Sequence, residues 1–167
     1  MKKTKSLAVS AVLIALALAL SYTERFIPLQ LVIPLPGIKL GLANIVTLVA
    51  IYYLGTRQAF PIVVIRCILG AVFGGGITGL LFSLTGSLLA TAVMALSRKI
   101  SFISIYGVSI LGAAAHNIGQ ICAAMVLMHS VYVAAYLPYL LAVGLATGLA
   151  TAAAAAAILK ALMRDRT

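Results

Sequence analysis

The sequence predicts an all-α integral membrane protein with six transmembrane helices. Two observations lead to this fold class. Of the 167 residues, 64% are hydrophobic and only 8% are charged, whereas a soluble domain carries charge on roughly a quarter of its residues. Apolar runs of about 15–22 residues also recur along the chain, and a helix of that length spans a bilayer core. A soluble globular fold is therefore excluded by composition.

The apolar runs divide the chain into spans that together form one transmembrane domain over residues 1–167. The predicted spans are residues 7–22, 40–54, 59–73, 77–96, 103–128 and 136–163. The second and third are short for a bilayer core of about 30 Å. The fifth and sixth exceed the length needed and are expected to tilt or to extend beyond the bilayer.

The basic residues sort to one side of this topology. Nine of the twelve lie before the first span, in the second or fourth connection, or at the carboxyl-terminal end of the chain: Lys2, Lys3, Lys5, Arg57, Arg98, Lys99, Lys160, Arg164 and Arg166. Only Arg25 and Lys39 fall on the other side, and Arg66 lies inside the third span. Because cytoplasmic loops are enriched in lysine and arginine, both termini are predicted in the cytoplasm. The net charge of +10 thus needs no nucleic-acid partner.

The amino-terminal segment allows an alternative reading. Three lysines, an apolar run and Ala17-Leu18-Ala19 also fit a secretory signal with a small-residue cleavage site. We favour a retained span, because the apolar pattern continues past Ala19 and further spans follow. The intact mass of the purified protein distinguishes the two.

Small residues form a stripe in the first span. Ala11, Ala15 and Ala19 recur every fourth residue, so they share one helical face. In lipid the hydrophobic effect does not drive helices together, so association depends on close packing, and a face of small residues lets another helix approach. The neighbour is either a helix of the same chain or another membrane protein. The sixth span repeats the pattern from Gly144 and Gly148, and there we favour internal packing.

Polar side chains within spans are the candidate functional residues, because they are costly in a membrane. Arg66 is the strongest, and His116 and Gln120 lie four residues apart with Asn117 beside them. These groups can bind a ligand. Alternatively, Arg66 snorkels to a headgroup, and the others tie helices together. No dense group of histidine, cysteine and carboxylate residues suggests a metal site.

The connection between the first two spans, residues 23–39, ends in PLPGIKLGLANI. Pro36 and Gly37 belong to a turn that proline stiffens and glycine sharpens. Lys39 adds positive charge, and Asn44 lies about one turn deeper in the second span. We expect a semi-rigid cap over a positively charged external mouth that captures a small anionic or amphipathic solute. A lipid-headgroup anchor without a ligand is the alternative.

Three stretches carry a family resemblance: PLPGIKLGLANIVTLVAIYYLG, VVIRCILG and LLFSLTGSLLATAVMAL. They resemble the Gx transporter family of small bacterial membrane proteins, also known by the description heptaprenyl diphosphate synthase component I. That family in turn resembles the substrate-binding S components of energy-coupling factor (ECF) transporters. Those proteins have six helices, cytoplasmic termini, a first external loop that helps to cover the ligand, and an alanine stripe that contacts a coupling subunit.

The resemblance implies a multi-pass protein of the bacterial plasma membrane with an ECF S-component-like bundle. By this resemblance, the alanine stripe docks on a transmembrane coupling subunit that works with ATPase subunits. Pro36, Gly37, Lys39 and Asn44 belong to the substrate mouth. No cofactor is implied, and the phosphate-binding pattern G-x-x-x-x-G-K-[ST] does not occur in the chain.

The synthase description conflicts with the chemistry of the chain. Prenyl diphosphate synthesis needs clustered carboxylates for magnesium, and the only acids are Glu24 and Asp165, predicted on opposite membrane faces. We therefore expect no enzymatic activity of this chain alone. The leading hypothesis is a substrate-binding subunit of an uptake transporter. The alternatives are an accessory subunit or scaffold for polyprenyl diphosphate or quinone synthesis, and a stand-alone secondary transporter.

Overall fold

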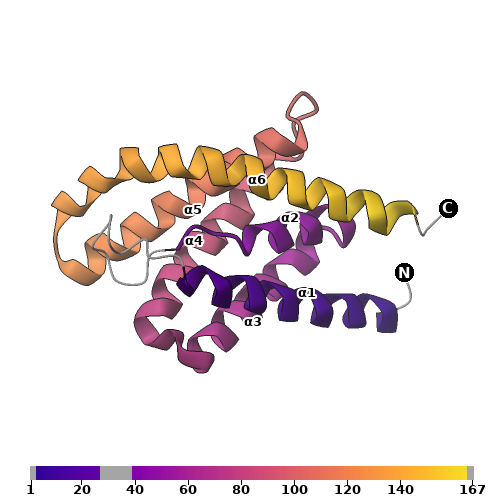
Figure 1. Ribbon diagram of the computed structural model, residues 1–167, viewed down its shortest axis with the longest axis horizontal. Helices are drawn as coiled ribbons and strands as arrows, with labels where there is room; N and C mark the ends of the chain where they lie inside the picture. Colours follow the sequence, from indigo (N-terminus) through magenta and orange to yellow (C-terminus); the bar gives the residue numbers. More distant parts are fainter. Residues whose placement is uncertain (1–2, 27–38, 165–167) are drawn as a thin grey trace.

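The computed structural model describes residues 3–26 and 39–164, and these residues form a bundle of helices (Figure 1). The elements are α1 (Lys3–Thr23), η1 (Glu24–Phe26), α2 (Asn44–Tyr53), α3 (Thr56–Gly70), η3 (Ala71–Gly75), α4 (Gly76–Ser97), α5 (Ile105–Met128), η4 (Val131–Tyr136) and α6 (Leu137–Arg164). No strand occurs in this part of the chain. The all-helical prediction is confirmed.

Several of the helices have the length and composition of membrane spans. Four stretches qualify within the described residues: Thr4–Thr23, Thr56–Ser97, Ile105–Met128 and Val131–Arg164. The second of these contains both α3 and α4, which are separated by a kink where the chain leaves helical geometry at Phe73 and at Gly74, whose φ is +104°. The long apolar helices support a membrane protein. Six crossings and the side on which the termini lie stay predictions.

α2 is shorter than the predicted span 40–54. Its ten residues, Asn44–Tyr53, extend about 15 Å at the α-helical rise, which is about half of a bilayer core. The chain before it is not helical, and Gly41 has a φ of +84°. α2 lies centrally in the bundle, between α1 and α6 (Figure 1). Irregular backbone is tolerated at such a place because surrounding helices cover it.

Two apolar clusters form the interior. The first surrounds α2, where Leu48 and Ile51 pack with Met94 of α4 and Val108 of α5. The second joins α4, α5, η4 and α6, and its members are Phe82, Ile121, Ala124, Val133 and Leu140. Along α4 and α5, a group of buried polar residues lies in sequence between the residues of these clusters.

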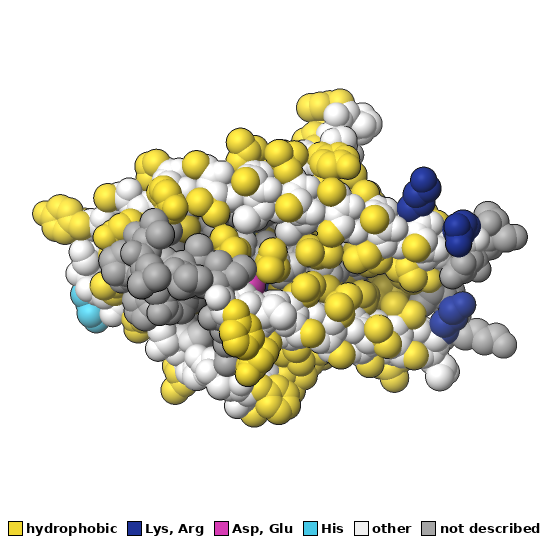
Figure 2. Space-filling model, viewed as in Figure 1, with side chains coloured by type: hydrophobic (Ala, Val, Ile, Leu, Met, Phe, Trp, Pro, Cys, Tyr) yellow, Lys and Arg dark blue, Asp and Glu magenta, His cyan; other side chains and the backbone are white. Residues whose placement is uncertain are grey.

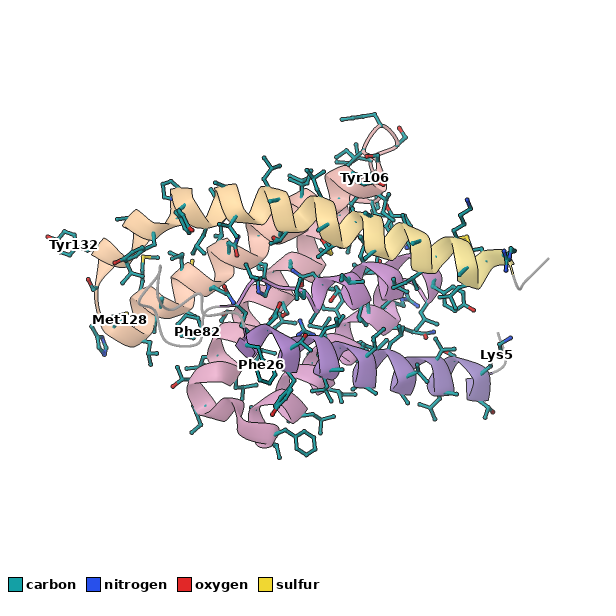
Figure 3. All side chains as sticks on the ribbon, in the orientation of Figure 1. Lys5, Phe26, Phe82, Tyr106, Met128 and Tyr132 are labelled. Carbon is teal, nitrogen blue, oxygen red and sulfur yellow. The ribbon has the colours of Figure 1, made fainter. Side chains whose placement is uncertain are left out.

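The face of the molecule seen in Figure 2 is largely apolar, and its lysine and arginine side chains lie at one end. Figure 2 shows hydrophobic side chains over most of the visible face, with lysine and arginine gathered where α1 begins and α6 ends. In Figure 3, Lys5 marks that end, and Met128 and Tyr132 mark the opposite one. An apolar surface this extensive suits contact with lipid rather than with water.

The small residues of α6 pack internally, as predicted. Gly144 and Gly148 are buried. A Cβ atom on Gly148 would lie 2.9 Å from the Cα of Ile110, and one on Gly144 would lie 2.5 Å from the side chain of Asn117. These close approaches explain why glycines occur where α6 crosses α5.

Candidate functional site

A largely buried polar cluster, in which only Ser21 and Lys39 are half-buried, lies where several elements of the bundle meet. Its residues come from α1, η1, the segment before α2, α2 itself, α3, α4 and α5. They are Ser21, Glu24, Lys39, Asn44, Arg66, Ser83, Ser87, His116 and Gln120. Arg66 is buried and Lys39 is half-buried, so two cations meet at one place in an apolar bundle.

Arg66 is fixed between α1 and α4. Its Nη1 donates to Ser21 Oγ over 3.2 Å, and its Nη2 donates to Ser87 Oγ over 2.5 Å. The side chain is only 6% exposed, which argues against snorkelling toward a headgroup. Its Nε has no hydrogen-bond partner among the described residues. A buried guanidinium held by neutral hydroxyls is a candidate binding group for an anion.

Lys39 joins the segment before α2 to α4 and α5. Its Nζ donates to Ser83 Oγ over 2.6 Å. With the Gln120 amide oriented to satisfy all its neighbours, the oxygen accepts from Lys39 N at 3.1 Å and from His116 Nε2 at 3.2 Å. The amide nitrogen donates to the Lys39 carbonyl at 3.1 Å. The predicted pair His116 and Gln120 therefore anchors the backbone of the predicted mouth residue Lys39.

Glu24 places a carboxyl group in the same cluster. It is only 5% exposed and accepts a hydrogen bond from the backbone amide of Leu42. Burial raises the pKa of the Glu24 carboxyl, while the Leu42 amide, Lys39 and Arg66 act in the opposite direction. The cluster thus combines two cations with one acid.

Gly41 explains part of the motif PGIKLG, with which the connection between the first two predicted spans ends. Its φ of +84° lies in the left-handed region that favours glycine. A Cβ atom there would lie 2.8 Å from Asn44 Nδ2 and 3.2 Å from His116 Cδ2. The glycine thus lets the segment before α2 lie against α5. Asn44 is buried in the same region, and its Oδ1 has no partner in the part of the chain that the structure describes.

Not all predicted site residues meet in this cluster. Asn117 Nδ2 donates to the Leu140 carbonyl over 2.7 Å, so it ties α5 to α6 instead. Pro36 and Gly37, the predicted cap, lie outside the described residues, as does the Arg25 side chain. Cys67 is buried and Cys122 is exposed, and neither takes part in the cluster.

A pocket of about 400 Å³ connects the cluster to the surface of α1 and α3. Its lining residues are Ala15, Leu18, Ala19, Ser21, Tyr22, Lys39, Gly70 and Phe73. Two of the predicted docking alanines and the predicted mouth lysine therefore line the same space. The volume falls in the range of about 300–1,000 Å³ that small-molecule pockets occupy.

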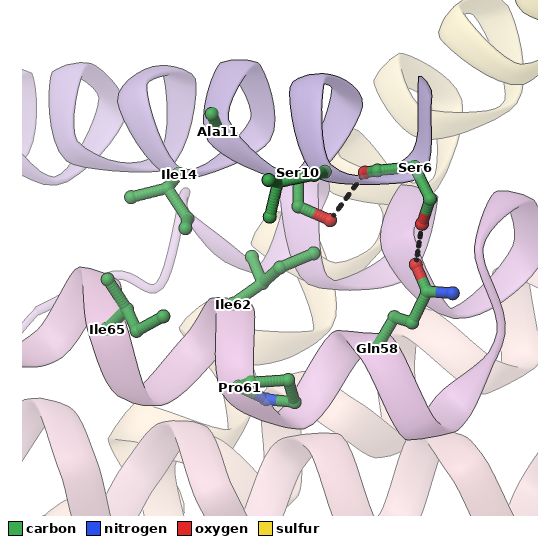
Figure 4. A pocket seen from close by; sticks show the side chains of 9 residues that line it. Ser6, Ser10, Ala11, Ile14, Gln58, Pro61, Ile62 and Ile65 are labelled. Atoms are coloured by element: carbon green, nitrogen blue, oxygen red, sulfur yellow. Dashed lines mark hydrogen bonds between the residues drawn. The ribbon is translucent and has the colours of Figure 1, made fainter. Parts of the chain in front are cut away.

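The alanine stripe of α1 faces outward. Ala11, Ala15 and Ala19 are all exposed, and Leu13 and Ala17 are the buried residues on this helix. Within the described residues, internal packing of α1 thus relies on another face. Ala11 lines a second groove of about 440 Å³ between α1 and α3. Figure 4 shows this groove, with Ser6 and Gln58 hydrogen-bonded over 2.5 Å at one end.

Sequence reasoning missed four members of the cluster. Ser83 and Ser87 did leave a signal, because they lie four residues apart with Thr91 following at the same spacing. Such a polar stripe in an apolar helix indicates an inward face. Ser21 and Glu24 show no such pattern in the sequence. They stand at the end of an apolar run beside Arg25 and read as ordinary loop residues.

The comparisons with known proteins give one match. Residues 13–158, well over half of the chain, match the family model described as heptaprenyl diphosphate synthase component I. Neither a curated protein nor a solved structure matches. The matched region holds every residue of the polar cluster. The chain belongs to the heptaprenyl diphosphate synthase component I family.

Proposed function

We propose that this chain is the substrate-binding subunit of an uptake transporter, and that it captures a small anionic or amphipathic solute from outside the cell. The observation that carries the proposal is the pair of cations formed by the buried Arg66 and the half-buried Lys39 in an apolar bundle. Charges in such surroundings are costly unless they are paired. The single carboxyl of Glu24 cannot neutralise both.

The anionic group of the solute is expected at these two cations. A carboxylate or phosphate can accept from Lys39 Nζ and from the Arg66 guanidinium, whose Nε lacks a partner among the described residues. Such charge-assisted hydrogen bonds are stronger than neutral ones. The adjoining pocket, with Leu18, Tyr22 and Phe73 on its wall, suits the apolar body of the solute.

The direction of capture follows from the charge distribution. Lysine and arginine gather at the end of the bundle where α1 begins and α6 ends (Figure 2). The positive-inside rule assigns that end to the cytoplasm, which leaves Lys39 nearer the external side. The exposed alanine face of α1 is then available to a membrane coupling subunit. Energy from ATPase subunits is an inference from the resemblance to ECF S components.

Native mass spectrometry of the protein released from nanodiscs tests the proposal. We expect the wild-type protein to retain an anionic ligand, and Lys39→Gln and Arg66→Gln to lose it. Arg57→Gln is the matched control, because Arg57 is an exposed cation at the start of α3, and it should retain the ligand. Equal retention by all four proteins would exclude an anion site at this cluster.

A second candidate function is favoured by the family description itself. As an accessory subunit of heptaprenyl diphosphate synthesis, the chain would present an isoprenoid to a separate synthase. That partner would supply the clustered carboxylates for magnesium, because this chain contains only two acids. Co-purification with a soluble prenyl synthase, without solute accumulation in cells, would support this role. Recovery of a membrane coupling protein instead would support the transport role.

A further inference from the structure

Glu24 is a buried acid in the polar cluster, and the proposed function gives it no part in ligand binding. It follows α1, yet its side chain is 5% exposed, and it accepts from the amide of Leu42. Three residues before Leu42 lies Lys39, whose Nζ reaches Ser83. The carboxyl is therefore held on the same short segment as one of the two cations.

The charged and titratable groups around Glu24 come from three elements. Lys39 belongs to the segment before α2 and Arg66 belongs to α3, and both stabilise the ionised carboxyl. His116 of α5 lies against Gly41, next to the Leu42 amide that Glu24 binds. Two fixed cations thus attract one carboxylate, as they would attract the anionic group of a ligand.

We propose that Glu24 is the internal counter-anion of this site, and that an incoming anion replaces it at Lys39 and Arg66 as Glu24 takes up a proton. The proposal rests on the anion site of the proposed function. The proton comes from the external solution and converts the carboxylate to a carboxylic acid. Anion binding and proton binding are thereby coupled, and each strengthens the other by the same factor.

Repulsion between like charges is the physical reason for the coupling. Before binding, the site holds Lys39 and Arg66 as cations and Glu24 as an anion, a net charge of +1. Binding without proton uptake would place a second anion beside Glu24 in apolar surroundings, where like charges disfavour each other. Burial raises the pKa of the carboxyl, which brings protonation closer to neutral pH.

Titration with benzenesulfonate tests the coupling. This probe stays a monoanion across the range and carries an apolar ring suited to the pocket. For the wild-type protein, we expect the affinity to fall by about tenfold per pH unit above the Glu24 pKa, as expected for one linked proton. Glu24→Gln should bind at every pH as tightly as the wild type does in acid. Asp165→Asn, which removes the only other acid of the chain, should keep the wild-type slope.

A direct measurement covers the case in which Glu24→Gln does not fold. In weakly buffered solution near neutral pH, binding of the probe to the wild-type protein should take up about one proton. Binding without proton uptake would overturn the role of Glu24 alone. An unchanged pH slope in Glu24→Gln would do the same, because a group other than Glu24 would then titrate. Absence of binding to either protein at every pH would overturn the anion site, and with it the proposed function.

Discussion

Lys39 Nζ donates to Ser83 Oγ over 2.6 Å, and this bond joins the segment before α2 to α4. Ser87, which accepts from Arg66 over 2.5 Å, lies one helical turn further along α4. One face of α4 therefore holds both cations of the site. Because α4 begins at the glycine-rich kink after α3, a movement of α4 about this kink would alter the hydrogen bonds to both Lys39 and Arg66.

Arg66→Lys tests whether the geometry of the guanidinium matters. Arg66 reaches Ser21 and Ser87 with two separate nitrogens, and a lysine ammonium cannot reproduce this fork. We expect benzenesulfonate affinity to fall by about tenfold, equivalent to about 1.4 kcal/mol. Arg57→Lys should bind as the wild type does. Unchanged affinity in Arg66→Lys would show that charge alone is enough.

Gly119→Ala tests the close crossing of α4 and α5 beside the site. A Cβ atom at Gly119 would lie 2.8 Å from the Cα of Gly86 and 2.8 Å from the Thr85 carbonyl oxygen. Since backbone cannot yield like a side-chain tip, we expect a loss of about 1–3 kcal/mol in unfolding free energy. Gly79→Ala on α4 meets nothing within 4 Å and should be neutral or slightly stabilising. Thermal unfolding in detergent compares them, and equal midpoints would contradict the crossing.

Asn117→Ala separates helix packing from ligand binding. Asn117 donates to the Leu140 carbonyl and lies outside the polar cluster. Interhelical hydrogen bonds in membranes contribute about 0.6 kcal/mol on average, so we expect a small fall in stability and unchanged benzenesulfonate affinity. If Asn117→Ala lost benzenesulfonate affinity while its stability stayed unchanged, Asn117 would have to be part of the binding site.

Ala11→Leu tests the docking face without touching the pocket at Lys39. Ala11 is exposed and lines the groove shown in Figure 4, whereas Ala15 and Ala19 also line the pocket beside the cluster. We expect Ala11→Leu to abolish co-purification of a membrane coupling protein, because leucine prevents close helix approach, while ligand retention stays intact. Ala153→Leu, on the exposed surface of α6, is the control. Retention of the partner by Ala11→Leu would remove the docking claim.

Cysteine labelling tests the six-span topology. In a variant without Cys67 and Cys122, we introduce Lys99→Cys after α4 or Tyr132→Cys in η4. The positive-inside rule predicts that position 99 reacts with an impermeant maleimide only after the cytoplasmic side is opened, and that position 132 reacts from outside. Labelling of both from one side would contradict an odd number of crossings between them.

Composition and periodicity were enough to predict the helices. Apolar runs fix where helices form in lipid, because every backbone group must be satisfied within the segment. Each predicted apolar run therefore overlaps one of the helices α1 to α6 in order, although α2 is shorter than its run. Its shortening depends on Gly41 and on cover by neighbouring helices, which are tertiary effects. The glycines of α6 were also interpreted correctly, since a small residue every fourth position needs a close neighbour.

The partners of the polar residues were decided by the tertiary structure. The sequence by itself determined that this is a helical membrane protein with a rare arginine in a span and a lysine beside a glycine turn. From the sequence, Asn117 was grouped with His116 and Gln120 as one candidate site. Successive side chains on a helix are rotated by about 100°, and Asn117 therefore lies toward α6 instead. The sequence contains no sign that Glu24 is buried, because burial of a charge depends on which opposite charges other helices bring to it. Only the packing of α1, α3, α4 and α5 around the segment before α2 placed Glu24, Lys39 and Arg66 in one cluster.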